Sequence, residues 1–192
     1  MPRCRDCPPP PVSTARAPFA FHGPARRAIH RLKFSGWRGI AGALAAAMTA
    51  LPSAPADVVT WVPLAPRGLA ARGYDQAHLL AQPIAHHLDL PCRNLLWRSV
   101  STGPQARRDG VDRRTALRGA FAVVPDAVVP ERVLLVDDVL TTGATAASCA
   151  DALIGAGARE VHVLTASRSF SGAAYTRKGP RPGLWLPGGV PR

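Results

Sequence analysis

The chain has 192 residues, the size of one domain, and its 47% hydrophobic content can bury a full core, which excludes wholesale disorder. Twenty-four basic residues against twelve acidic ones give a formal net charge of +12, which favours phosphorylated ligands or nucleic acid as partners. The longest apolar run, Ile40–Leu51, is about half of what crosses a bilayer, and residues 1–11 show no apolar signal region. We therefore expect no membrane insertion and a cytoplasmic location.

Residues 1–24 are predicted to be an appendage in front of the domain. Cys4 and Cys7 form one Cys-x-x-Cys pair, which is half of the usual four-ligand set of a structural Zn²⁺ site. The four prolines at 8–11 predict a stiff polyproline II spacer, so the rest of this segment is interpreted as a linker. Cys92 and Cys149 lie far apart in the chain and are expected to be small buried hydrophobic residues.

Between residues 25 and 170, apolar runs alternate with helical patterns. The run Val133–Val136 is typical of a central parallel strand. Gly157 closes the predicted helix 144–156. Pro83 lies inside the predicted helix 74–88, at a point where that helix can kink. Strands that alternate with helices predict an α/β fold with an open, mostly parallel sheet flanked by helices. The predicted helices are 25–34, 40–51, 74–88 and 144–156, and the predicted strands are 57–63, 94–97, 133–136 and 161–165.

Two further segments have little apolar patterning. A polar, basic loop is predicted after residue 97, through about residue 112. Residues 171–192 are rich in Gly, Pro and Arg and are predicted to be a mostly unstructured tail.

The segment Val133–Thr145 carries the strongest chemical signal. Its apolar run delivers Asp137 and Asp138 to the carboxyl end of a strand, where open α/β sheets bind ligands. Gly143 lets the following turn approach a ligand closely, and the next helix directs its positive N-terminal end to the same place. Carboxylates suit vicinal sugar hydroxyls or Mg²⁺, and the turn suits a monophosphate. A ribose 5-phosphate would satisfy both.

Other readings of this segment fit the residues less well. A Walker A loop needs a lysine that is absent here, and Gly155 and Gly157 follow a helix rather than opening one, unlike a dinucleotide fingerprint. A response-regulator receiver begins with a similar acidic pair, but only 54 residues follow Asp138, too few for the rest of that fold. Two aspartates that merely cap a helix are disfavoured because adjacent carboxylates repel each other without a cation or donors to hold them.

Val133–Thr145 resembles the phosphoribosyl pyrophosphate (PRPP) binding motif of type I phosphoribosyltransferases. Three further blocks are similar to the ComF-like branch of that family, which is associated with competence and DNA uptake in bacteria: IHRLKFSG at 29–36, WVPLAPRGLAARGYDQAHLLA at 61–81, and TGPQARRDGVDRRTALRGAF at 102–121. The resemblance implies a type I phosphoribosyltransferase fold over residues 25–170. It also implies that residues 1–24 contain an incomplete zinc ribbon, with Cys4 and Cys7 as its remaining ligands.

The resemblance also implies roles for individual residues. Asp137 and Asp138 would hold the ribose hydroxyls, directly or through Mg²⁺, and together with Arg113 they are the expected catalytic residues. The basic stretch 98–113 corresponds to a mobile loop that closes over PRPP, with Gln105, Arg107 and Arg113 in it. Thr141 stands where purine-salvage relatives carry an aspartate base, so this motif supplies no base for an acceptor. The expected ligands of the 5-phosphate are Thr141, Thr142, Gly143, Ala144 and Thr145. The turn 63–67, after the strand that contains Trp61, falls where the family binds pyrophosphate, and the expected ligands there are Leu64, Ala65, Arg67 and Arg72.

Two functions follow as hypotheses. In the first, the protein is an enzyme, a Mg²⁺-dependent phosphoribosyltransferase of the pentosyl-transferring class, which moves the phosphoribosyl group of PRPP to an acceptor that the sequence does not define. In the second, the basic face of the same fold binds single-stranded DNA without catalysis, alongside other competence or DNA-uptake proteins. The charge of +12 favours the second somewhat, since closing on PRPP alone needs only a few arginines.

Overall fold

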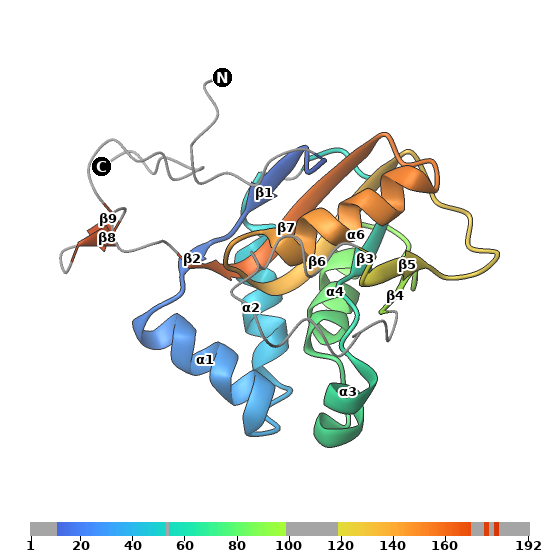
Figure 1. The fold of residues 1–192 in the computed structure, drawn as a ribbon. Helices are drawn as coiled ribbons and strands as arrows, with labels where there is room; N and C mark the ends of the chain where they lie inside the picture. The colour runs from blue at the N-terminus through green and yellow to red at the C-terminus, as the bar shows by residue number, and fades with distance from the viewer. Residues whose placement is uncertain (1–10, 53, 99–118, 170–174, 177–178, 181–192) are drawn as a thin grey trace, which may run out of the picture.

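The computed structural model describes residues 11–52, 54–98, 119–169, 175–176 and 179–180 (Figure 1). Five strands form one sheet, and every pairing within it is parallel. The order is β1–β7–β6–β3, with β2 also paired to β7. Parallel pairing throughout this sheet confirms the predicted α/β class. The strands are β1 (Thr14–Arg16), β2 (Phe19–Ala20), β3 (Val58–Trp61), β6 (Arg132–Leu140) and β7 (Glu160–Arg168).

Helices cover both faces of the sheet, because successive side chains of a strand point to opposite sides. On β6, Leu134 and Val136 join one apolar cluster, whereas Val133 and Leu135 join the other. The first cluster packs against α1 (Gly23–Phe34), α2 (Ile40–Thr49) and α4 (Gln76–His87), and the second packs against α6 (Ala144–Gly155). The two-layered core therefore centres on β6 and β7.

The remaining elements lie outside the main sheet. The short helix α3 (Pro66–Arg72) buries none of its residues and lies beyond α4 (Figure 1). The antiparallel pair β4 (Leu96–Arg98) and β5 (Phe121–Val123) flanks the segment 99–118, which is outside the described residues. Within the predicted tail, β8 (Tyr175–Thr176) pairs with β9 (Gly179–Pro180), and the rest of the tail is outside the described residues.

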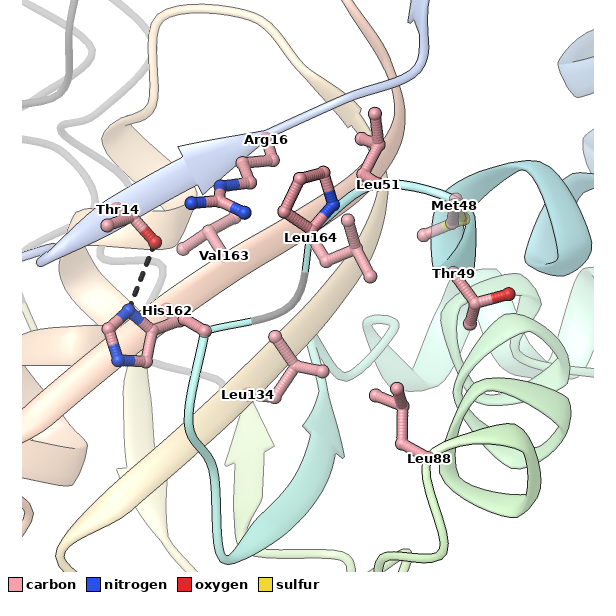
Figure 2. A pocket seen from close by; sticks show the side chains of 12 residues that line it. Thr14, Arg16, Met48, Thr49, Leu51, Leu88, Leu134, His162, Val163 and Leu164 are labelled. Atoms are coloured by element: carbon pink, nitrogen blue, oxygen red, sulfur yellow. Dashed lines mark hydrogen bonds between the residues drawn. The ribbon is translucent and has the colours of Figure 1, made fainter. Parts of the chain in front are cut away.

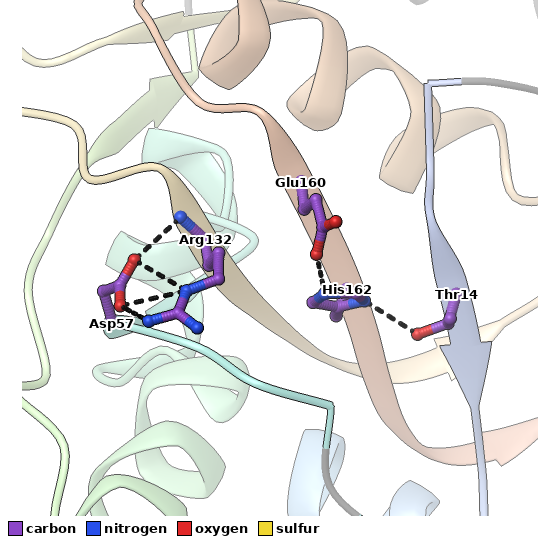
Figure 3. Close-up of polar contacts among 5 residues, drawn as sticks. All are labelled: Thr14, Asp57, Arg132, Glu160 and His162. Atoms are coloured by element: carbon purple, nitrogen blue, oxygen red, sulfur yellow. Dashed lines mark hydrogen bonds and ion pairs between the residues drawn. The ribbon is translucent and has the colours of Figure 1, made fainter.

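The sheet begins earlier in the chain than the sequence predicts. Residues 14–20, interpreted above as linker, form β1 and β2 and pair with β7. Two side-chain contacts of His162 support this edge: its Nε2 lies 3.1 Å from Glu160 Oε2, and its Nδ1 lies 3.0 Å from Thr14 Oγ1 (Figure 3). The sequence signal was weak because each strand has only two or three residues beside prolines. The linker interpretation is corrected for this stretch.

At the amino-terminal end of the strands, the carboxylate of Asp57 accepts from the backbone N–H of Arg132 at 3.0 Å and from its guanidinium (Figure 3). This contact ties β3 to β6 at the edge opposite the carboxyl ends. The helix α4 continues across Pro83 as one element. Among the described residues, no helix combines the length and apolar character needed to span a membrane.

Candidate functional site

The acidic pair lies inside a strand, not after it. β6 was predicted to end at Val136, but it runs to Leu140, and its register with β7 continues to the pair Leu140–Arg168. The sequence underestimated β6 because Asp137 and Asp138 interrupt its apolar pattern. Since side chains alternate along a strand, the two carboxylates leave β6 on opposite faces.

Asp138 points to the face covered by α1. Its Oδ2 lies 2.8 Å from Nζ of Lys33, in the last turn of that helix. The side chain of Asp138 is only 4% exposed, and that of Lys33 is 23% exposed. A carboxylate so far from water requires a counter-charge, and Lys33 supplies it.

Asp137 points to the face covered by α6, where its charge also acts on the thiol of Cys149. Burial raises the pKa of Asp137 well above its usual range, and the neighbouring charge of Asp138 raises it further. The backbone N–H of Asp138 and the charge of Lys33 lower the pKa of Asp137, and both effects are smaller. Part of the residue's surface remains exposed, in contrast to Asp138. Burial, and then the charge of Asp137, raise the pKa of Cys149, which is an inert core residue as expected.

The turn after β6 has the geometry of an anion-binding loop. Thr141 and Thr142 are exposed, and Gly143 precedes α6 with a φ of 78°, in the left-handed region that favours glycine. Ala144 and Thr145 form the first turn of α6, where backbone N–H groups have no partner within the helix. The N–H of Ala144 has a long contact of 3.4 Å with Thr142 Oγ1. All five predicted phosphate ligands therefore lie together at the N-terminus of a twelve-residue helix, beside Asp137 and Asp138.

The second predicted turn follows β3, at the same edge of the sheet. The N–H of Leu64 donates to Asp75 Oδ2 at 2.7 Å, so this amide already has a strong partner. Ala65 is the N-cap of α3, and Pro66 occupies the first turn, where proline is well tolerated. The predicted turn 63–67 is thus shorter than expected, and Arg67 lies on a helix.

The two arginines predicted to contact pyrophosphate differ in their surroundings. Arg67 is exposed at the start of α3. Arg72 donates to Gln76 Oε1, and its guanidinium carbon lies 5.2 Å from the ring centre of Phe34. The side chain of Arg72 is therefore engaged between α1 and α4, whereas that of Arg67 extends to solvent.

A cleft of about 520 Å³ opens beside this turn. Within it the rings of Trp61 and His78 stack with their centres 4.2 Å apart, and Trp97 is 43% exposed. Its volume is in the range of small-molecule sites. A second cavity, between β1 and the end of α2, measures only about 20 Å³, room for about one water molecule, and Thr14, Arg16 and His162 line it (Figure 2).

Several predicted residues lie outside the described part of the chain: Arg113, Gln105 and Arg107 of the mobile loop, and Cys4 and Cys7 of the zinc pair. Within the described ranges, no group of three or more His, Cys, Asp or Glu residues has the arrangement to hold a metal ion. The carboxylates of Asp137 and Asp138 also diverge. The residues therefore fit Mg²⁺ only as an ion that arrives on ligand phosphates and meets one protein carboxylate.

Sequence reasoning missed two residues of this site. Asp75 anchors Leu64 and also caps α4 by accepting from the N–H of Ala77 at 2.9 Å. Lys33 lies about a hundred positions before its partner Asp138. A signal existed for each, because Lys33 is one of two lysines among 24 basic residues and both residues lie in the ComF-like blocks.

The comparison with solved structures defines the class. The chain superimposes on a glutamine PRPP amidotransferase from B. subtilis, complexed with ADP and GMP, with a TM-score of 0.51 and 25% identity. The match covers 71% of this chain and 30% of that one. With its parallel sheet and the strand of Asp137 and Asp138 leading through a glycine turn into a helix, the protein has the type I phosphoribosyltransferase fold.

The comparison with curated proteins gives the family. The chain is 32% identical over 174 residues to the DNA utilization protein YhgH of Salmonella typhi, covering 84% of this chain and 75% of that protein. It is 39% identical over 101 residues to Competence protein F of Haemophilus influenzae, covering 51% of this chain and 44% of that protein. No protein-family model matches the chain. The protein belongs to the ComF/YhgH family.

Proposed function

We propose that this protein binds PRPP together with Mg²⁺ and transfers its phosphoribosyl group to an acceptor. The observation that carries the proposal is the junction of β6 and α6, where Asp137 lies beside the turn 141–143 and the first turn of α6, whose N–H groups have no partner within the helix. A 5-phosphate on this turn and a ribose against the carboxylate could be bound with β6 and α6 arranged as they are. The fold neighbour that acts on PRPP supports the same ligand.

The reaction itself would be a displacement at C1 of the ribose. A nucleophilic atom of the acceptor bonds to C1, the bond from C1 to the pyrophosphate oxygen breaks, and pyrophosphate leaves with the electron pair. Positive charge develops on the sugar, which Asp137 is placed to offset. Mg²⁺, when bound, would neutralise the pyrophosphate oxygens. Arg67, which is exposed beside the β3 turn, is the described arginine best placed to contact them.

Thermal unfolding with different ligands tests the proposal. PRPP with Mg²⁺ at about 100 times its Kd is expected to raise Tm by roughly 5–10 °C. Ribose 5-phosphate and pyrophosphate, each of which fills half of the site, should raise it less. Pyrophosphate release on adding candidate acceptors then tests transfer. Equal shifts with PRPP and with pyrophosphate alone would show that the ribose is not recognised, and would contradict the proposal.

A second function, binding of single-stranded DNA, is favoured by a specific surface. We call it the aromatic–arginine surface. It lies at the ends of α1 and α3 and consists of Arg31, Phe34, Trp37, Arg38 and Arg72. Phe34 is 68% exposed and Trp37 is 55% exposed. The guanidinium carbon of Arg31 lies 4.5 Å from the ring centre of Trp37. Exposed rings and arginines together suit stacked bases and backbone phosphates, and the relatives named for competence and DNA utilization support this role.

Fluorescence anisotropy with a labelled oligothymidylate tests this second function. Contacts to about 6–10 phosphates predict a loss of about 10³–10⁵ in affinity between 50 and 200 mM salt. Replacing Phe34 and Trp37 with alanine should cost about 1–3 kcal/mol for each stacked base that is lost. Trp97→Ala is the matched control, since Trp97 is also exposed but lies outside this surface. A flat salt dependence, or equal losses in the control, would contradict DNA binding here.

A further inference from the structure

We propose that the Lys33 ammonium, rather than the Asp138 carboxylate, is the group that meets the sugar hydroxyls on the α1 side of the site. In this arrangement Asp138 is a positioning residue that acts through Lys33. The inference rests on the proposed function, because it concerns the same PRPP site. It departs from the roles that the ComF resemblance implies, in which both aspartates contact the ribose.

The exposed fractions of the Asp138 and Lys33 side chains indicate that Lys33 lies between Asp138 and the solvent. The side chain of Asp138 is 4% exposed and that of Lys33 is 23% exposed, with Nζ and Oδ2 2.8 Å apart. A ligand approaching this face therefore meets the ammonium first. An ammonium has three N–H donors, and an ion pair with the single oxygen Oδ2 cannot occupy all of them, so donors remain for ligand oxygens.

The position of Lys33 is held by its neighbours in the last turn of α1. Leu32 is fully buried, and its carbonyl accepts a hydrogen bond from the Tyr74 hydroxyl. Phe34 lies under the guanidinium of Arg72 at 5.2 Å. Residues on both sides of Lys33 are thus anchored to other elements, which fixes the start of its side chain. The buried Asp138 carboxylate then fixes the other end.

This arrangement changes the chemistry of the sugar subsite. Two carboxylates would offer only acceptors to the vicinal hydroxyls of a ribose. With Lys33 in front of Asp138, the α1 side of β6 instead offers a donor, while Asp137 offers an acceptor from the α6 side. Lys33 offsets one carboxylate charge of the acidic pair before any ligand arrives. A donor and an acceptor together suit a vicinal diol, in which one hydroxyl donates while its neighbour accepts.

A double-mutant cycle on PRPP binding tests the inference. Calorimetric titrations with PRPP and Mg²⁺ would compare the wild type, Lys33→Met, Asp138→Asn and the double variant. We expect Lys33→Met to weaken binding about 10- to 100-fold, as for the loss of a charged hydrogen bond. Asp138→Asn should weaken binding less, and adding it to Lys33→Met should cause no further loss. Lys33→Arg should recover part of the affinity.

The controls separate this inference from stability and from the proposed function. Lys33→Met leaves the buried Asp138 carboxylate unpaired, so the folding of this variant is checked by thermal unfolding. The double variant removes both charges, and its PRPP affinity can be compared with that of Asp138→Asn alone even if Lys33→Met is unstable. Arg27→Met, an exposed cation on the same helix, should bind PRPP as the wild type does. If Asp138→Asn costs the same affinity with Lys or Met at position 33, or if Lys33→Met binds normally, the inference is wrong while PRPP binding stands. A wild type that does not bind PRPP overturns both.

Discussion

The backbone N–H of Asp138 donates to Oδ1 of Asp137 at 2.8 Å, so the two acidic residues are joined along the strand. This hydrogen bond lowers the pKa of Asp137, but burial and the charge of Asp138 raise it by more. The native protein therefore holds a carboxyl group whose ionisation the fold opposes. Such a group is typical of a site whose partner is a ligand rather than the protein itself.

Asp137→Asn is expected to stabilise the protein near neutral pH. A carboxyl group with a raised pKa in the folded state binds its proton more tightly there than in the unfolded chain, so its contribution to stability is present at low pH and is lost as pH rises through the folded pKa. The asparagine side chain does not ionise, so the variant does not lose this stability as pH rises. The variant should melt at a higher temperature than the wild type at pH 7, and the two melting curves should converge at acid pH. A lower Tm for the variant at pH 7 would contradict this explanation.

Asp57→Asn is expected to show the opposite pH dependence. The hydrogen bonds and charge of Arg132 lower the pKa of Asp57. A lowered pKa gives stability that is present above the unfolded pKa and is lost as pH falls through the folded pKa. The variant should therefore melt below the wild type at pH 7, and the difference should vanish in acid. Because Asp57 lies at the other end of the strands, PRPP binding should be unchanged.

Gly143 is expected to tolerate no side chain. Its φ of 78° lies in the left-handed region, so Gly143→Val should cost about 1–3 kcal/mol of stability and displace the turn 141–143. Gly155, the last residue of α6, provides the control, since a Cβ there meets no atom within 4 Å and its φ is not positive. Gly155→Ala should stabilise by about 0.4–1 kcal/mol and bind PRPP normally. Urea unfolding and PRPP titration of both variants check this pair of outcomes.

Asp75→Ala is expected to affect stability and ligand binding together. The variant loses the N-cap of α4, worth about 0.5–2 kcal/mol, and releases the N–H of Leu64 from its 2.7 Å hydrogen bond. The β3 turn should then become less ordered and PRPP affinity should fall. Asp151→Ala, an exposed acid on α6, should stay within about 0.5 kcal/mol of the wild type. Full PRPP affinity in Asp75→Ala would show that this turn does not contribute to binding.

The sequence predicted the elements that carry long apolar patterns. The helix starting at Ala144 and the strands through Val133 and Val161 are confirmed, because their burial pattern is visible in the residues themselves. The short strands β1 and β2 were missed, since their stability comes from pairing with β7. The helix α3 was missed and its first two residues were interpreted as part of the turn 63–67, because this helix buries no apolar residue.

For the candidate site, the local motif was predictable and its partners were not. Asp137, Asp138 and the turn 141–145 are contiguous, so one strand–turn–helix pattern brings them together. Lys33 and Asp75 reach the site only through tertiary packing, and nothing local in their sequence specifies that contact. The predicted roles of the contiguous residues remain predictions until a ligand is bound.

A calorimetric titration of the purified protein with PRPP, with and without Mg²⁺, tests the central claim most directly. The account predicts saturable binding that depends on Mg²⁺ and is lost when Asp137 and Asp138 are both replaced by asparagine, while the variant retains a cooperative unfolding transition. No saturable heat at millimolar PRPP, or equal binding by the double variant, would contradict the assignment of this strand end as a PRPP site.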